Sequence, residues 1–204
     1  TVGLDLGSGS LIMSGSGTLL LDLASIFAGA TINSGIVRIG NDSSLGAGTI
    51  TLLSGATLDL NGRTIANTLV LNAGATVTGG SLSTATTPTT GTVDVVLTGT
   101  TLTKEDAGRL ELTAANTYTG ATTVNSGTVA VADFGNGTDP SPLGTSALDN
   151  PANLVIGGAT LEFTGATNTS TARSFTVAGT GTIAATGVGT LEFNSSSKIN
   201  LTGE

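Results

Sequence analysis

The chain has 204 residues, of which 38% are hydrophobic and only 3% aromatic, and its formal net charge is −8. Small aliphatic side chains must therefore fill the core. The negative charge disfavours binding to nucleic acid or to anionic membranes, because a protein binds either of them through a basic surface. No apolar run is long enough to insert into a membrane as a helix. Without Cys or His, disulfides, thiolate metal sites and imidazole catalysis are excluded.

Short segments of alternating apolar and polar residues recur along the chain, each closed by Gly, Asn or Asp. This alternation predicts β-strands. No window of ten or more residues has the apolar repeat of 3.6 that an amphipathic helix requires. The 31 glycines supply the positive φ angles of tight turns. The clearest predicted strands are 49–53, 56–60, 68–71, 75–78, 153–156, 159–163 and 181–184.

A longer unit also recurs, with copies that open at Gly17, Gly108 and Gly189. Such self-similarity predicts a solenoid, in which each coil buries its inner face only against neighbouring coils. We therefore expect an all-β fold, a right-handed parallel β-helix of roughly nine coils of about 20–25 residues each. We expect the whole of 1–204 to be one continuous solenoid, divided into a partial repeat (1–16), repeat one (17–107), repeat two (108–188) and the start of a third (189–204).

All four prolines fall in two stretches, 86–91 and 133–153. Proline cannot donate to a strand ladder, so both stretches are expected to be loops that project from the rod. Loops on a rigid scaffold often carry function, and the alternative is a tolerated surface insertion. The candidate interaction residues of the second loop are Asp133, Phe134, Asp139 and Asp149.

An acid between two apolar residues occurs six times, and on a strand this pattern points the acid outward. A row of carboxylates would suit Ca²⁺, but the chain lacks the glycine-aspartate calcium repeat. We favour a solvated outer face and expect no metal site and no cofactor. The charged run at 104–106, with Arg109, is likewise expected to be a solvated turn. The six acids are Asp5, Asp22, Asp59, Glu111, Glu162 and Glu192.

Two further functions are known to use β-solenoids. A carbohydrate-binding or carbohydrate-cleaving β-helix would need acids clustered with Arg or Lys in a groove, whereas the six basic residues here are scattered singly. We therefore expect no catalytic residue, although a carboxylate pair for glycoside hydrolysis stays open. Ice binding needs a Thr-x-Thr pair at one place in every coil, and the spacing of these pairs along the chain is irregular. Ice binding is the minor alternative.

The run NTYTG at 116–120, followed by VNSG at 124–127, closely resembles the passenger-associated transport repeat, also called the autotransporter-associated β-strand repeat, of bacterial surface proteins. A weaker copy covers 17–39, where Phe27 stands in place of the tyrosine. We read the tyrosine as a packing residue and the first asparagine as closing a turn. The motif positions are Asn116, Tyr118, Gly120, Asn125 and Gly127.

This resemblance implies a β-helix passenger that is exported and displayed outside the cell, on the bacterial surface, without implying an activity. We expect a non-enzymatic structural or adhesive segment, and an excerpt or processed piece of a longer protein. Open solenoid ends expose unpaired backbone groups. They would pair with another copy, giving head-to-tail filaments, or with flanking repeats, and glycans or a host or cell surface would be further partners. The main alternative is the carbohydrate-binding or carbohydrate-cleaving β-helix.

Overall fold

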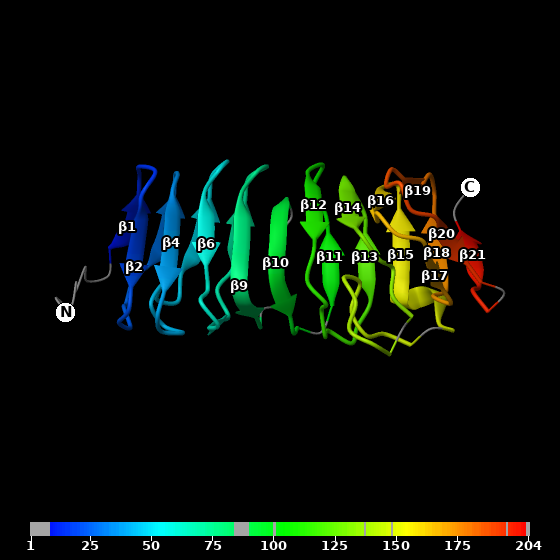
Figure 1. The fold of residues 1–204 in the computed structure, drawn as a ribbon, viewed down its shortest axis with the longest axis horizontal. Coiled ribbons are helices and arrows are strands. Elements are labelled where there is room, and N and C mark those ends of the chain that lie inside the picture. The colour runs from blue at the N-terminus through cyan, green and yellow to red at the C-terminus, as the bar shows by residue number, and fades with distance from the viewer. Residues whose placement is uncertain are drawn as a thin grey trace.

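The computed structural model describes residues 9–83, 90–99, 101–136, 138–147, 149–194 and 196–202. These residues form a rod in which the strands follow one another along the long axis, from the N-terminal end to the C-terminal end (Figure 1). All pairings between named strands are parallel. Helix is confined to one 3₁₀ turn, η1 (Pro151–Asn153), among the described residues. The predicted all-β solenoid of about nine coils is confirmed.

One sheet, called here the long sheet, runs along the rod. Nine of its strands are stacked in sequence order, one from each coil, and β7 pairs beside β9. The strands are β2 (Thr18–Leu21), β4 (Ile36–Ile39), β6 (Thr57–Asp59), β7 (Thr64–Ile65), β9 (Thr76–Leu82), β10 (Gly91–Leu97), β12 (Arg109–Leu112), β14 (Thr128–Val131), β16 (Thr160–Phe163) and β19 (Thr182–Ala185).

The first face of the rod is formed by strands that precede most long-sheet strands and are joined to them by a tight turn. One part of this face is a four-stranded sheet, made of β1 (Ser10–Met13), β3 (Gly29–Ile32), β5 (Thr49–Leu52) and β8 (Leu69–Leu71). A five-stranded sheet continues it, made of β11 (Leu102–Lys104), β13 (Thr122–Val124), β15 (Leu154–Gly157), β18 (Phe175–Ala178) and β21 (Ile199–Thr202).

The third face is formed by the segments that follow the long-sheet strands. It is the least regular face, and its separate two-stranded sheet pairs β17 (Thr169–Thr171) with β20 (Leu191–Phe193). The segment that opens at Gly189 therefore leads into the third face, whereas the segments that open at Gly17 and Gly108 lead into the long sheet. The third opening does not occupy the same place in a coil as the first two.

The core is a set of stacked apolar rows. In the long sheet one row runs without interruption through nine coils, and its members from Val37 to Phe163 are buried. Burying each such side chain stabilises the fold by about 1.5–3 kcal/mol. The register partners in this row are, in order, Leu19, Val37, Leu58, Val77, Val93, Leu112, Val131, Phe163 and Ala185.

Coil length varies although the register of the long sheet is maintained. Val77 and Val93 are register partners over the shortest step, and Val131 and Phe163 are partners over a step twice as long. The extra residues lie outside the long sheet, in 133–153. The seven clearest predicted strands are all present, with bounds that differ by one or two residues apart from the longer β9. The predicted loop at 86–91 lies mostly outside the described residues.

Candidate functional site

The turn of the repeat motif fastens one coil to the coil before it. The backbone N–H of Asn125 donates to Lys104 O at 2.9 Å, and its Nδ2 donates to Glu105 Oε1 at 2.8 Å. In the first copy, Asn33 uses the same two donors on the preceding turn. Gly127 has φ +68° and lies against the backbone of that turn, so a side chain would have no room. The motif is a coil-to-coil connector.

The tyrosine of the motif lies in the core. Tyr118 is 1% exposed, and its hydroxyl lies 2.7 Å from Thr122 Oγ1. Burial raises the pKa of Tyr118 far above its usual value, because the phenolate would lose its hydration. Phe27 is buried in the same way in the first copy. Gly120 lies in the bend that leads into β13.

The first asparagine of the motif joins the end of β10 in the preceding coil to the segment around Pro142. Asn116 is buried, its Oδ1 accepts from Leu97 N at 2.9 Å, and its Nδ2 donates to Pro142 O at 2.7 Å. In the first copy Ser25 takes the corresponding place and donates to Ser44 O at 2.8 Å. Asn116 therefore satisfies buried backbone groups of both neighbouring layers, beyond the single turn expected from the sequence.

Residues 133–136 and 138–146, called here the insert, form an extra layer within the third face. One limb pairs with the motif: Asn116 N donates to Ser141 O and Thr145 N to Tyr118 O, each at 2.9 Å. The expectation that this stretch projects from the rod is therefore wrong for the limb from Ser141 onward. Proline does not prevent this packing, because Pro142 needs only its carbonyl.

The other limb of the insert packs on the following coil. Thr171 Oγ1 donates to Gly135 O at 2.6 Å, and Ala172 N donates to Asn136 Oδ1 at 3.0 Å. Thr169 Oγ1 donates to Asp133 Oδ1 at 3.0 Å. The insert is therefore held from both sides, as part of the wall of the rod.

A buried arginine ties the two limbs together. Arg173 is fully buried, and its Nε donates to Phe134 O at 3.0 Å on one limb. On the other limb, its Nη1 donates to Ser146 Oγ at 2.8 Å and its Nη2 to Gly144 O at 3.2 Å. Burial lowers the pKa of Arg173. No motif marks Arg173 in the sequence, and strand alternation would not have identified it, because Ser174 beside it is buried as well.

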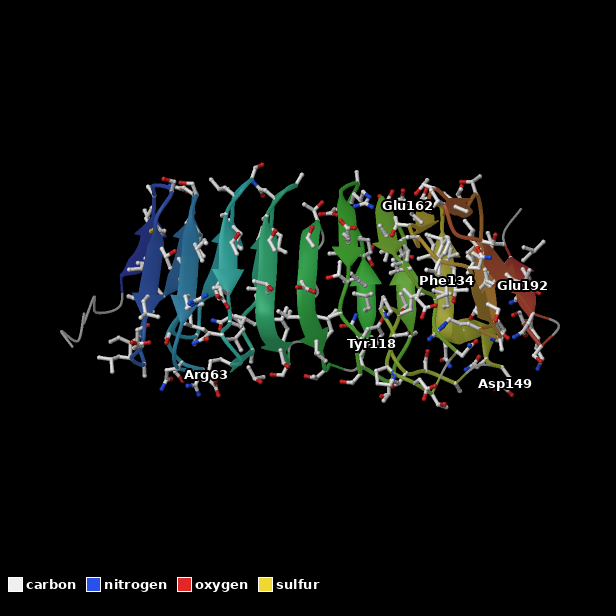
Figure 2. The ribbon with its side chains drawn as sticks, in the orientation of Figure 1. Arg63, Tyr118, Phe134, Asp149, Glu162 and Glu192 are labelled. Carbon is white, nitrogen blue, oxygen red and sulfur yellow. The ribbon has the colours of Figure 1, made fainter. Side chains whose placement is uncertain are left out.

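The four candidate interaction residues have different environments. Phe134 is fully buried, with its ring centroid 6.4 Å from that of Phe163 and 5.9 Å from that of Phe193. It is thus unavailable to a partner in this structure. Asp133 is half-buried and accepts from Gly135 N and Thr169. Asp139 and Asp149 are exposed, and Figure 2 shows Phe134 within the rod and Asp149 at its lower edge. An interaction through the two exposed acids stays a prediction.

The charged turn at 104–106 is not fully solvated, which corrects the expectation. Lys104 is fully buried in β11, where its register partner is the apolar Val124. Its ammonium group donates to the backbone carbonyl and the carboxylate of Asp106. The charge is thereby compensated within its own turn.

The outer surface of the long sheet carries acids in contact with arginines. Arg38 Nε lies 2.7 Å from Asp59 Oδ2, and Arg109 binds both Glu111, at 3.2 Å, and Glu162, at 2.9 Å. The outward direction predicted for the acids is found for these three. At Asp22 the prediction that both flanking leucines point inward is wrong for one of them, because Leu23 is 49% exposed. Asp5 lies outside the described residues.

Threonines align on the long sheet despite their uneven spacing along the chain. Thr57, Thr76 and Thr92 are successive register partners, and Thr128, Thr160 and Thr182 form a second ladder. Coils of different length absorb the uneven spacing, so irregularity along the sequence does not exclude a regular array. Each ladder spans only three coils, and ice binding stays untested.

Two hollows lie on the third face, and the first of them has a mainly polar lining. The first has a volume of about 290 Å³ and is lined by Asn168, Thr169, Ser170, Thr190 and Glu192. The second has a volume of about 260 Å³ and is lined by Asp42, Ser43, Gly46, Ala47, Ala66 and Asn67.

Within the described ranges, no three His, Cys, Asp or Glu side chains are grouped to hold a metal ion. No helix of that part is long and apolar enough to cross a membrane.

The stacked coils and their connecting turns define a parallel β-solenoid assembled from sequence repeats. The family model of the passenger-associated transport repeat matches residues 7–39 and 102–131. The chain thus carries two copies of this repeat, and the family predicted from the sequence is confirmed.

A longer protein is similar to nearly the whole chain. Over 206 residues, which cover 95% of the chain, it is 36% identical to the adhesin BmaC autotransporter of Brucella suis biovar 1 (strain 1330). The chain spans 6% of the length of that relative. No solved structure matches the chain.

Proposed function

We propose that this chain is a structural and adhesive segment of a protein displayed on a bacterial surface. The observation that carries the proposal is the similarity along 95% of the chain to part of an adhesin autotransporter. Two copies of the passenger-associated transport repeat support it. The location outside the cell rests on the same two observations.

The segment acts through its shape, and we propose no catalytic role. A rod with continuous parallel ladders holds its surface groups at fixed positions, which suits multivalent contact with another surface. On the long sheet, Asp59 and Glu162 are already bound by arginines. Carboxylates held in this way are poor candidates for the acid and base of glycoside hydrolysis.

We further propose that the end coils pair with another solenoid coil. At one end, β2 is the last strand of the long sheet, and its Leu19 and Leu21 are only partly buried. Near the other end, Ile199 and Leu201 of β21 are exposed by 57% and 75%, although they are register partners of the more buried Phe175 and Val177. Flanking coils of a longer chain, or a second copy of this one, would bury these side chains.

Cell binding tests the adhesive proposal. Beads coated with the purified chain should bind to cultured host cells more strongly than beads coated with an unrelated β-solenoid of similar charge. Equal binding by the two kinds of bead would contradict the adhesive function. Because the control shares the fold, a difference would come from the surface groups of this chain.

Negative-stain electron microscopy tests the end pairing. Fibres of constant width that lengthen with protein concentration are expected if copies stack head to tail. Discrete short rods at every concentration would contradict pairing between copies. Rods that lengthen when further repeats of the same kind are joined to the chain would then assign the ends to flanking coils.

A further inference from the structure

The first hollow has the attributes of a binding site. It lies between the neighbouring strands β17 and β20, where Ser170 and Glu192 are register partners. The Ser170 hydroxyl and the Glu192 carboxylate make no hydrogen bond or ion pair within the described part of the chain. Two polar groups thus stand side by side on rigid strands, ready to bind a ligand.

The walls of this hollow are fixed by hydrogen bonds. Asn168 Oδ1 accepts from Thr190 N at 2.9 Å, and Thr169 N donates to Thr190 O at 2.8 Å. The Thr169 side chain is in turn held by Asp133 of the insert. The insert therefore has a second role beside filling the wall, because it fixes one side of the hollow.

The second hollow serves as an internal comparison. There Asn67 Nδ2 donates to the carbonyls of both Gly46 and Gly48, at 3.0 and 2.9 Å. Asp42 Oδ1 accepts from Thr64 N at 3.3 Å. The amide and the carboxylate of that hollow are engaged in holding the coil. Only in the first hollow is the carboxylate free to bind a ligand.

We propose that the first hollow is a subsite for neutral carbohydrate. A free carboxylate accepts hydrogen bonds from vicinal sugar hydroxyls, and the Asn168 amide and the Ser170 hydroxyl can donate to sugar oxygens. No cation lines the hollow, and the net charge of −8 disfavours acidic sugars.

This inference rests on the proposed adhesive function and assigns its contact to one place. A printed array of neutral oligosaccharides at high density is the probe, because close spacing reveals weak binding. The double variant S170A/E192Q should bind at least about tenfold more weakly than the unaltered chain. The matched control is S54A/D22N, which removes one exposed hydroxyl and one exposed carboxylate outside the hollow and should leave binding unchanged. D139N/D149N tests the two exposed acids of the predicted interaction loop. Tyr118 fluorescence reports that each variant is folded.

Each other outcome would overturn the assignment in a distinguishable way. If the chain binds cells but no neutral glycan, the hollow is not a carbohydrate subsite and the adhesive function stands. If D139N/D149N loses binding and S170A/E192Q keeps it, the contact lies at those exposed acids and not in the hollow. If the chain binds neither cells nor glycans, the adhesive function fails and the subsite fails with it.

Discussion

Arg109 and Glu162 are 53 residues apart in sequence, yet Arg109 Nε lies 2.9 Å from Glu162 Oε2. The strand between them contributes Ala130, the register partner of both Glu111 and Glu162. Because the alanine side chain is short, the guanidinium can reach across it to the second acid. The hydrogen bonds to Glu162 and Glu111 raise the pKa of Arg109 although partial burial opposes this.

Substituting Glu162 should cause a loss of stability that depends on pH. The hydrogen bond from Thr186, at 2.7 Å, and then that from Arg109 lower the pKa of Glu162. The carboxylate therefore contributes stability above its unfolded pKa of about 4.3, and this is lost as pH falls through the lower folded pKa. Measured by urea unfolding, E162Q should lower the free energy of unfolding by about 1 kcal/mol at neutral pH and by less in acid. E192Q is the control, and an equal cost of E162Q at both pH values would contradict the prediction.

Tyr118 should remain protonated well above the usual tyrosine pKa of about 10. It is the only tyrosine and the chain has no tryptophan, so phenolate absorbance reports on it alone. The unfolded chain loses this proton first as pH rises, so the stability of the rod should decline above about pH 10. Y118F should lower the free energy of unfolding by about 1 kcal/mol at neutral pH. The stability of this variant should also decline less above about pH 10, because it has no phenol to ionise. Phenolate formation near pH 10 in the folded rod would show that the ring is not buried.

Two glycines with similar φ angles should respond differently to substitution by alanine. Gly144 has φ +73°, and an added Cβ would lie 2.6 Å from Tyr118 O. Gly158 has φ +64°, and an added Cβ would meet nothing within 4 Å. G158A should cost about 1–2 kcal/mol of backbone strain, and G144A a further 1–3 kcal/mol from the clash. Equal free energies of unfolding for the two variants would show that the Gly144 contact is not tight.

Removing the Arg173 guanidinium should loosen the insert. R173M leaves the buried Phe134 and Gly144 carbonyls without these donors, at a cost of at least about 2 kcal/mol. Hydrogen exchange should rise in 133–146 and stay unchanged in β4 and β6. R63M, at an exposed arginine, is the control and should change stability by less than about 0.5 kcal/mol. Unaltered exchange in the insert of R173M would mean that the arginine does not hold it.

Strand positions were predictable because most long-sheet strands alternate and bury one side, as β4, β6 and β12 do. The predictions failed at residues whose neighbours let them take a position that is unusual for their residue type. Lys104 occupies an inward position because Asp106, two residues later, compensates its charge. The three prolines of 133–153 suggested a projecting loop, but the carbonyls of Pro142 and Pro151 both accept hydrogen bonds within the fold. Proline excludes donation only.

The hollow at β17 and β20 could not be predicted from the sequence. The separation of Ser170 and Glu192 fits one coil of the expected length. Coils in this rod differ twofold in length, however, so that separation does not by itself identify register partners. The same holds for the threonine ladders, whose members follow one another at unequal intervals. Register in this fold is set by stacked apolar rows, and coil length must be known before outer residues can be aligned.

Positions along this rod are counted in coils and not in residues. Val77 and Val93 lie one strand spacing apart, about 4.8 Å, and so do Val131 and Phe163 across twice as many residues. A segment added between two long-sheet strands therefore alters only a lateral surface of the rod. The positions of the other surface groups along the rod axis stay the same. A protein of this kind can gain a new lateral feature, as it has in 133–146, without displacing those it already presents.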